Sequence, residues 1–202
     1  MESRTITIEA TGTCDVSPDV VTVTATAVAT GTTASTARST VHSRGETIRA
    51  AVGERISASI TTVDLRVQSG AVTFAPEMDA EFRAVEEFQL RCEPASVADV
   101  VVEITDSGGT IQAVEYQLTD TSRAGAEDEA LEAAIDRAHE KATTIAAETG
   151  VAVGEPQAVT TKRVATGQEA VVDDAWESSD SLHPAPIAVA EAVEVSYALI
   201  EQ

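Results

Sequence analysis

Apolar and polar residues alternate over residues 18–31, whose sequence is PDVVTVTATAVATG. This period of two predicts a β-strand with one apolar face and one polar face. The apolar face carries Val21, Val23, Ala25, Ala27 and Ala29. The polar face carries Thr22, Thr24, Thr26 and Thr30. We expect these threonines to meet either water or a second subunit.

The same alternation predicts six more strands, at residues 4–10, 60–68, 80–92, 111–119, 156–164 and 189–200. Gly12, Pro18 and Asp19 are expected to form the turn between the first two strands. The strand at 60–68 is predicted to place Val63, Leu65 and Val67 on one face. The inner face of the strand at 80–92 is apolar except for Glu86.

Three stretches have a helical period instead, at residues 32–52, 94–109 and 126–149. In the second, Val97, Val100, Val101 and Ile104 have the spacing of one helix face, and two glycines follow as a stop signal. In the third, alanine recurs every four residues from Ala130 to Ala146, and Gly150 ends the pattern. Small residues on such a ridge let a helix lie close to its support.

The predicted order of elements is ββαββαβαββ. Paired strands separated by helices indicate an α+β fold, an antiparallel or mixed sheet with its helices packed on one face. We expect one domain over residues 1–202, with an exposed acidic loop at 165–186.

Charge and composition bear on environment more than on activity. The chain has 34 acidic and 13 basic residues among 202, a formal net charge of −21, and only two lysines. Three interpretations arise: a disordered chain, an acidic partner for basic proteins, or a protein adapted to molar salt, as in extremely halophilic archaea. The regular apolar periods argue against disorder, and we favour salt adaptation. No basic patch exists to meet phosphates, which argues against nucleic-acid binding.

The sequence shows no membrane span and no signal peptide, so we expect a cytoplasmic protein, or an exported one if a leader has been removed. Cys14 and Cys92 are too few and too far apart for a disulfide framework or a zinc site. We expect two partly buried thiols on strands.

A search for catalytic and ligand-binding motifs predicts no catalytic, cofactor-binding or metal-binding residue. The three histidines form no metal-binding pattern, and no nucleophile elbow or phosphate loop is present. The acidic residues of the 165–186 loop lack the alternation of a calcium loop, although they leave a cation site open as an alternative. Trp176, in the same loop, is a candidate contact residue. The acidic residues considered are Asp173, Asp174, Glu177 and Asp180, and the histidines are His42, His139 and His183.

Four stretches together resemble the SIMPL-domain family, which includes bacterial periplasmic immunogenic proteins. They are ATGTCDVSPDVVTVTATAVATG, ITTVDLRV, FRAVEEFQLRC and the alanine-rich ALEAAIDRAHEKATTIAAETGVAVGEP. The resemblance implies a non-enzymatic protein that associates with itself, possesses no cofactor and has been linked to stress protection. The alternative is an uncharacterised metal-dependent hydrolase that uses the acidic loop.

Overall fold

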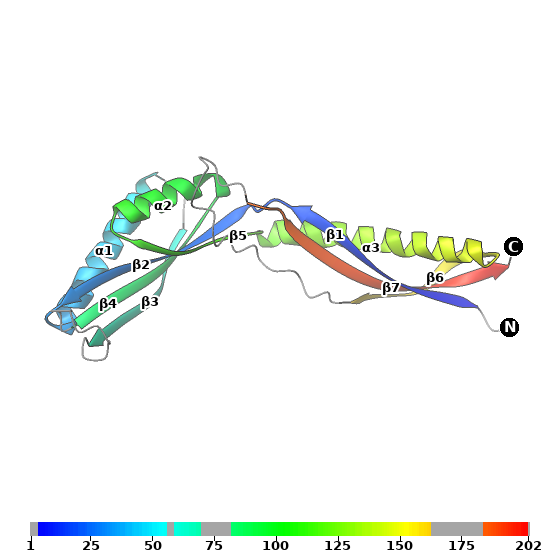
Figure 1. Cartoon of the computed structure of the whole chain (residues 1–202), viewed down its shortest axis with the longest axis horizontal. Helices are drawn as coiled ribbons and strands as arrows, with labels where there is room; N and C mark the ends of the chain where they lie inside the picture. The colour runs from blue at the N-terminus through cyan, green and yellow to red at the C-terminus, as the bar shows by residue number, and fades with distance from the viewer. Residues whose placement is uncertain (1–3, 56–58, 70–81, 163–183, 202) are drawn as a thin grey trace. The chain divides into compact units, whose positions relative to one another are not determined.

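The computed structural model of the chain describes residues 4–55, 59–69, 82–162 and 184–201. These residues form two compact units, each with its own sheet (Figure 1). The first and last strands of the chain belong to unit 1, and the central part, from Pro18 to Gln117, belongs to unit 2. The expected single domain over residues 1–202 stays a prediction.

Unit 1 is a three-stranded antiparallel sheet covered by one long helix. Its strands are β1 (Thr5–Val16), β7 (Ile187–Glu201) and β6 (Val151–Lys162), in the order β1-β7-β6. The helix α3 (Asp120–Glu148) runs along the sheet (Figure 1). It begins at Thr119, whose hydroxyl accepts a hydrogen bond from the Ser122 backbone N–H at 3.3 Å, a standard N-cap.

Only alanines are buried along α3, which confirms the predicted ladder. They recur every four residues: Ala126, Ala130, Ala134, Ala138, Ala142 and Ala146. The sheet side of this core is larger and includes Ile8, Val193, Val195 and Tyr197. Because the fully buried side chains of the helix are all alanine, its axis can lie close to the sheet.

The backbone of α3 lies very close to β1 at Gly12. A Cβ atom at this position would lie 2.0 Å from the Ala130 carbonyl oxygen and 2.4 Å from the Ala134 nitrogen. Gly12 therefore lies inside β1 rather than in the predicted turn, and the strand continues to Val16. A glycine in a strand marks a turn or a close backbone contact, and here it marks the contact.

We expect Ala138→Leu to destabilise the fold by about 1–3 kcal/mol, since it adds three carbons where the helix contacts the sheet. Ala138 is completely buried, whereas Glu140 on the same helix is exposed. Glu140→Leu is the control and should change the free energy of unfolding by less than about 0.5 kcal/mol. Urea unfolding at fixed KCl measures both variants. Equal losses would show that the alanine ladder does not limit packing.

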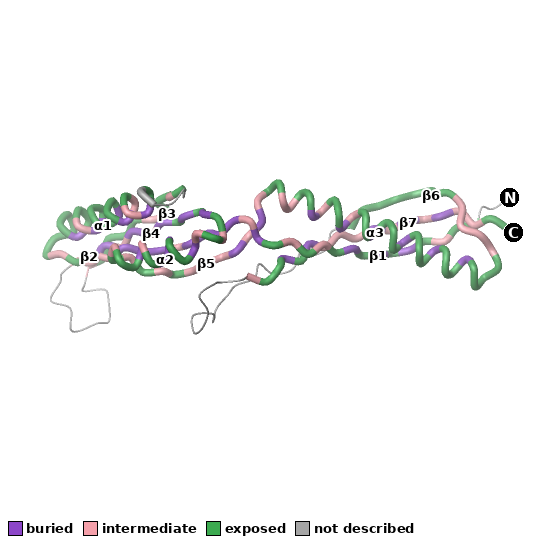
Figure 2. Tube along the Cα trace, turned by 90° about the horizontal axis from the view of Figure 1, so that it is seen from above, coloured by how far each residue is buried: buried purple, intermediate pink, exposed green. Residues whose placement is uncertain are grey.

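Unit 2 is a four-stranded antiparallel sheet with two helices on one face (Figure 1). Its strands, in the order β3-β4-β2-β5, are β3 (Ser59–Ser69), β4 (Phe82–Cys92), β2 (Val20–Gly31) and β5 (Thr110–Gln117). The helices are α1 (Ala34–Arg55) and α2 (Val97–Asp106), the latter preceded by the short 3-10 helix η2 (Pro94–Ser96). Buried residues follow β2 and β4, the two central strands (Figure 2).

The expected α+β class and the order of elements are confirmed. The strands divide between two antiparallel sheets, however, where one sheet was expected. The division follows from pairing partners: β1 pairs with β7 at the far end of the chain, while β2 pairs with β4 and β5. In the described part of the chain, no helix is both long and apolar enough to cross a membrane.

The threonine face of β2 is less open than the sequence indicates. Thr22 and Thr26 are 8% and 9% exposed, so both are buried. The reason is the central position of β2, which lets longer side chains from β5 cover the threonines. Thr22 donates a hydrogen bond to the Gln117 side-chain oxygen at 3.3 Å, and Thr26 accepts one from the Gln112 side chain at 3.2 Å. Thr24 is half-buried and Thr30 is exposed, so only part of the predicted threonine strip faces solvent.

Candidate functional site

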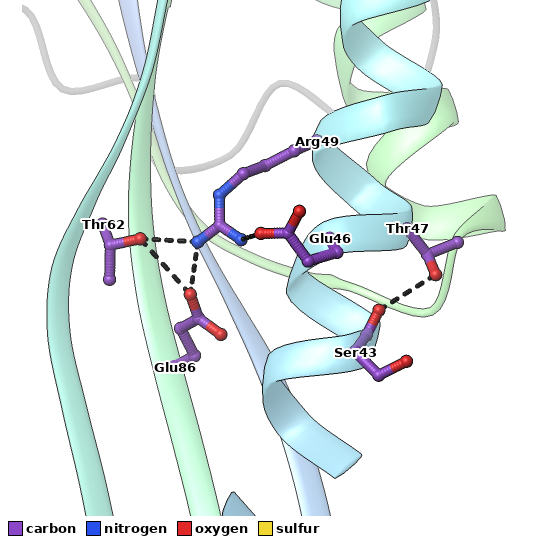
Figure 3. Close-up of polar contacts among 6 residues, drawn as sticks. All are labelled: Ser43, Glu46, Thr47, Arg49, Thr62 and Glu86. Atoms are coloured by element: carbon purple, nitrogen blue, oxygen red, sulfur yellow. Dashed lines mark hydrogen bonds and ion pairs between the residues drawn. The ribbon is translucent and has the colours of Figure 1, made fainter. Parts of the chain in front are cut away.

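A polar cluster lies between α1 and the edge of the unit 2 sheet. Glu86 is on the helix-covered face of β4 and is only 3% exposed. Arg49 reaches it from α1 and forms an ion pair with its carboxylate (Figure 3). The same guanidinium donates to Glu46 Oε1 at 2.8 Å and to Thr62 Oγ1, on β3, at 2.5 Å. We call these four residues, Glu46, Arg49, Thr62 and Glu86, the Arg49 cluster.

Gly45 makes room for the buried carboxylate. A Cβ atom at Gly45 would lie 2.6 Å from Glu86 Oε2 and 3.0 Å from its Cδ. The carboxylate therefore packs directly against the backbone of α1. Its other oxygen, Oε1, accepts hydrogen bonds from Arg49 and Thr62, while Oε2 is buried with no hydrogen-bond partner among the described residues.

The Arg49 cluster links three elements of unit 2: α1 through Arg49, β4 through Glu86, and β3 through Thr62. Thr62 is the last residue before an irregularity in β3, since the pairing with β4 shifts register between Thr62 and Asp64. Val63 is the extra residue of this β-bulge, which breaks the alternation of the strand. The cluster thus fixes β3 on its inner side at the point where the strand is irregular.

The β-bulge takes Val63 out of the face on which Val63, Leu65 and Val67 are predicted to lie together, while Leu65 and Val67 still share one face. Val63, Leu65 and Val67 are 52%, 41% and 39% exposed, so none is part of the core. Beyond the bulge, Asp64 pairs with Glu87 and Leu65 with Glu86, which places Leu65 and Asp64 on opposite faces. Asp64 and Arg66 form an ion pair with each other on the strand.

β3 is an edge strand with its outer side unpaired among the described strands. Such an edge presents free backbone N–H and C=O groups, and a long edge with exposed apolar side chains is prone to pair with another chain. β3 has eleven residues and carries three of the large hydrophobic residues that are exposed in the described structure. Its outer side is therefore the strongest candidate contact surface of unit 2.

The two edges of the unit 1 sheet are protected by contrast. Along β1, Arg137 donates to the Thr11 carbonyl oxygen at 2.8 Å, and Lys141 donates to the Glu9 carbonyl oxygen at 3.1 Å. These side chains of α3 thus donate hydrogen bonds to backbone carbonyl groups of the β1 strand. β6 contains Pro156 and two register shifts, features that limit pairing at an edge.

Both lysines of the chain contact Glu9 of β1, Lys141 from α3 and Lys162 from β6. Lys162 forms ion pairs with Glu9 and with Glu194, the latter at 2.8 Å, and thereby links β6, β7 and β1. The hydrogen bonds that Lys162 donates to Glu194 and Glu9 raise the pKa of the lysine, and the bond to Glu9 lowers the pKa of that carboxyl group. A surface cavity of about 360 Å³ is lined by Glu9, Lys162, Arg137 and Lys141 among others. Its cations are already held by carboxylates and backbone carbonyls.

The two cysteines are free thiols on strands, as expected. Cys14 belongs to unit 1 and donates a hydrogen bond to Glu129 Oε2 at 3.1 Å, which raises the pKa of its thiol. Cys92 belongs to unit 2, and burial raises its thiol pKa. Both shifts favour the protonated, less nucleophilic form.

The remaining candidates are placed as follows. His42 and His139 are exposed on α1 and α3, and His139 packs edge-on against Tyr197 with ring centroids 5.8 Å apart. Among the residues that the structure describes, no group of three or more His, Cys, Asp or Glu side chains could hold a metal ion. The expected acidic loop lies almost wholly outside the described residues, and so do Asp173, Asp174, Trp176, Glu177, Asp180 and His183.

Sequence reasoning noted Glu86 as a break in an apolar face but missed its partner. The available signal was on α1, where Gly45, Glu46 and Arg49 lie within one helical turn. A buried carboxylate requires a cation, and Arg49 is the arginine whose helix position faces it.

The family model described as "SIMPL: Protein of unknown function (DUF541)" matches residues 6–197, nearly the whole chain. No curated protein matches the sequence at a significant level.

Proposed function

Because the chain belongs to the SIMPL family of proteins of unknown function, we propose on structural grounds that it is a non-enzymatic protein that associates with itself in high salt. One observation carries the proposal: the edge of β3, which pairs with no second strand among those described, together with its exposed Val63, Leu65 and Val67. A role in stress protection, a cytoplasmic location and the absence of catalytic activity belong to the same proposal and stay predictions.

The experiment is static light scattering on the purified chain in 2 M KCl over a range of concentrations. We expect a mass at least twice that of the 21.0 kDa chain. Symmetric association through one self-complementary surface gives dimers, the commonest oligomers. A mass equal to one chain at every concentration would contradict the proposal.

Salt adaptation makes a separate prediction. At ~0.1 M salt the Debye length is about 10 Å, so the carboxylates responsible for the net charge of −21 repel one another across the surface. At ~1 M it falls to about 3 Å and the repulsion is screened. We expect the melting temperature to rise by more than about 5 °C from 0.1 to 3 M KCl, since ~2 kcal/mol shifts it by ~4–8 °C at this chain length. Circular dichroism measures it, and a flat or falling melting temperature would argue against salt adaptation.

A further inference from the structure

We infer that two copies of the chain pair antiparallel through β3, about a twofold axis at Leu65, to form one continuous eight-stranded sheet. The inference rests on the proposed self-association and adds its partner, surface and register. The occupant of the open edge is thus the same strand of a second copy.

In one antiparallel register, each charged residue of β3 lies opposite a residue of opposite charge on the second copy. In an antiparallel pair centred on Leu65, Asp64 lies opposite Arg66 of the second copy, and Arg66 lies opposite the second copy's Asp64. Directly opposed side chains have Cβ atoms ~4.5–5.5 Å apart, close enough for the two ion pairs to form. The twofold axis produces both pairs at once.

Neighbouring registers are disfavoured by the same charges. If the two strands paired about Asp64, the Asp64 carboxylates of the two copies would lie opposite each other. If they paired about Arg66, the two Arg66 guanidinium groups would do so. Like charges directly opposite each other destabilise a sheet. A shift of one strand by one residue would place Leu65 opposite Asp64 or Arg66 of the second copy. It would also turn the second copy's strand over, so that its side chains point to the opposite faces of the sheet. The sequence of β3 therefore selects the register as well as the partner.

The apolar residues of the strand agree with this arrangement. Leu65, 41% exposed in the single chain, would pack against Leu65 of the second copy on the twofold axis. Val67, 39% exposed, would lie opposite the bulge residue Val63 of the second copy, which is 52% exposed. Association would thus cover the exposed apolar side chains of β3.

The charge balance of β3 permits this pairing within an acidic protein. β3 carries one acidic and one basic residue, so its net charge is zero, while the chain as a whole carries −21. Two copies can meet here without opposing their excess carboxylates. The Arg49 cluster holds the inner side of β3 through Thr62, so the edge is already ordered before a second copy binds.

The decisive experiment is a charge swap between two variants. Asp64→Arg leaves two cations on the strand and Arg66→Asp leaves two anions, so each variant opposes like charges in its own dimer. We expect each to associate about tenfold more weakly than the wild type at 0.5 M KCl. An equimolar mixture should recover wild-type association, because every opposed pair is then one cation and one anion.

Two controls separate pairing from folding and total charge. Asp136→Arg makes the same change in charge on an exposed position of α3 and should leave association unchanged. The double variant Asp64→Arg/Arg66→Asp restores both the pair within the strand and the pairs between copies, and should associate as the wild type does. Melting temperatures of all variants in the same 0.5 M KCl show whether the monomers are folded.

A cross-linking readout tests the register with little change to the strand. In a chain carrying Cys14→Ser and Cys92→Ala, Leu65→Cys should form a disulfide between copies on mild oxidation, because the two thiols meet on the axis. Thr61→Cys is the matched control on the same strand. Its two copies would be ~26 Å apart, eight residues at ~3.3 Å each, and should not cross-link.

The outcomes distinguish this inference from the proposed function. A monomeric wild type would overturn both. A wild-type oligomer that the charge variants leave intact, a mixture that stays dissociated, or cross-linking at Thr61→Cys instead of Leu65→Cys would overturn the β3 pairing and leave self-association in place. Recovery in the mixture together with cross-linking at residue 65 supports it.

Discussion

Gly12→Ala should destabilise the protein by more than about 3 kcal/mol, the upper range for an overpacked core. The added methyl group would lie 2.0 Å from the Ala130 carbonyl oxygen, 2.4 Å from the Ala134 nitrogen and 2.9 Å from the Ala133 carbonyl carbon. All three are backbone atoms, so no side chain can rotate away and α3 must move off β1. The φ angle of Gly12 is not positive, so the cost is steric rather than conformational.

Urea unfolding in 2 M KCl measures this loss, and Gly125→Ala provides a control of opposite sign. Gly125 lies within α3, is exposed, and a Cβ there would meet nothing within 4 Å. Alanine is favoured over glycine in a helix by ~1 kcal/mol, so this variant should be more stable than the wild type. A Gly12→Ala protein as stable as the wild type would mean that β1 and α3 do not touch at this point.

Arg49→Met should cost about 3 kcal/mol, because it leaves the buried Glu86 carboxylate without its cation. The estimate is at the low end for buried pairs, since 24% of the Arg49 side chain is exposed and water can reach the site. Methionine keeps much of the volume of the arginine stem, so the loss reports mainly on charge. Urea unfolding at fixed pH and KCl measures it.

A double-mutant cycle separates the ion pair from packing. Arg49→Met/Glu86→Gln removes both charges and should be more stable than Arg49→Met alone, because no unpaired carboxylate remains buried. Glu46→Gln removes only the exposed partner of Arg49 and should change stability by less than about 0.5 kcal/mol. Strict additivity in the cycle would show that Arg49 and Glu86 do not interact.

The elements that the sequence predicts best are those that pack one regular face against one core. β2, β4 and α2 have a regular apolar face because each packs against one continuous core, and their predicted inner residues are buried. The alanine ladder of α3 belongs to the same class. In each case, a single period in the sequence reports one packed face.

The errors arose where a distant contact decides the local structure. The alternation of β3 breaks at Val63, next to the point where Arg49 and Glu86 bind Thr62, and these two residues are 13 and 24 positions away. Gly12 was assigned to a turn because the helix that requires it begins more than a hundred residues later. Periodicity likewise contains no information on strand partners, so the division into two sheets could not be predicted.

The candidate contact site was only partly visible for the same reason. Glu86 interrupts an apolar face and could be noticed, whereas the exposure of Leu65 depends on the position of β3 at a sheet edge. For Thr22 and Thr26 the position in the sheet has the opposite effect. Their polarity predicts exposure, but both are buried because β2 is a central strand.

The alanine face of α3 has a thermodynamic consequence. Burying an alanine costs no side-chain conformational entropy, whereas burying a leucine or isoleucine costs ~0.5–1 kcal/mol. The six buried alanines of the helix therefore dock without loss of rotamer freedom. They also remove little apolar surface from water, and the heat-capacity change of unfolding scales with that surface. The temperature dependence of α3 docking should accordingly come mainly from the larger side chains of the sheet, such as Ile8, Val193 and Tyr197.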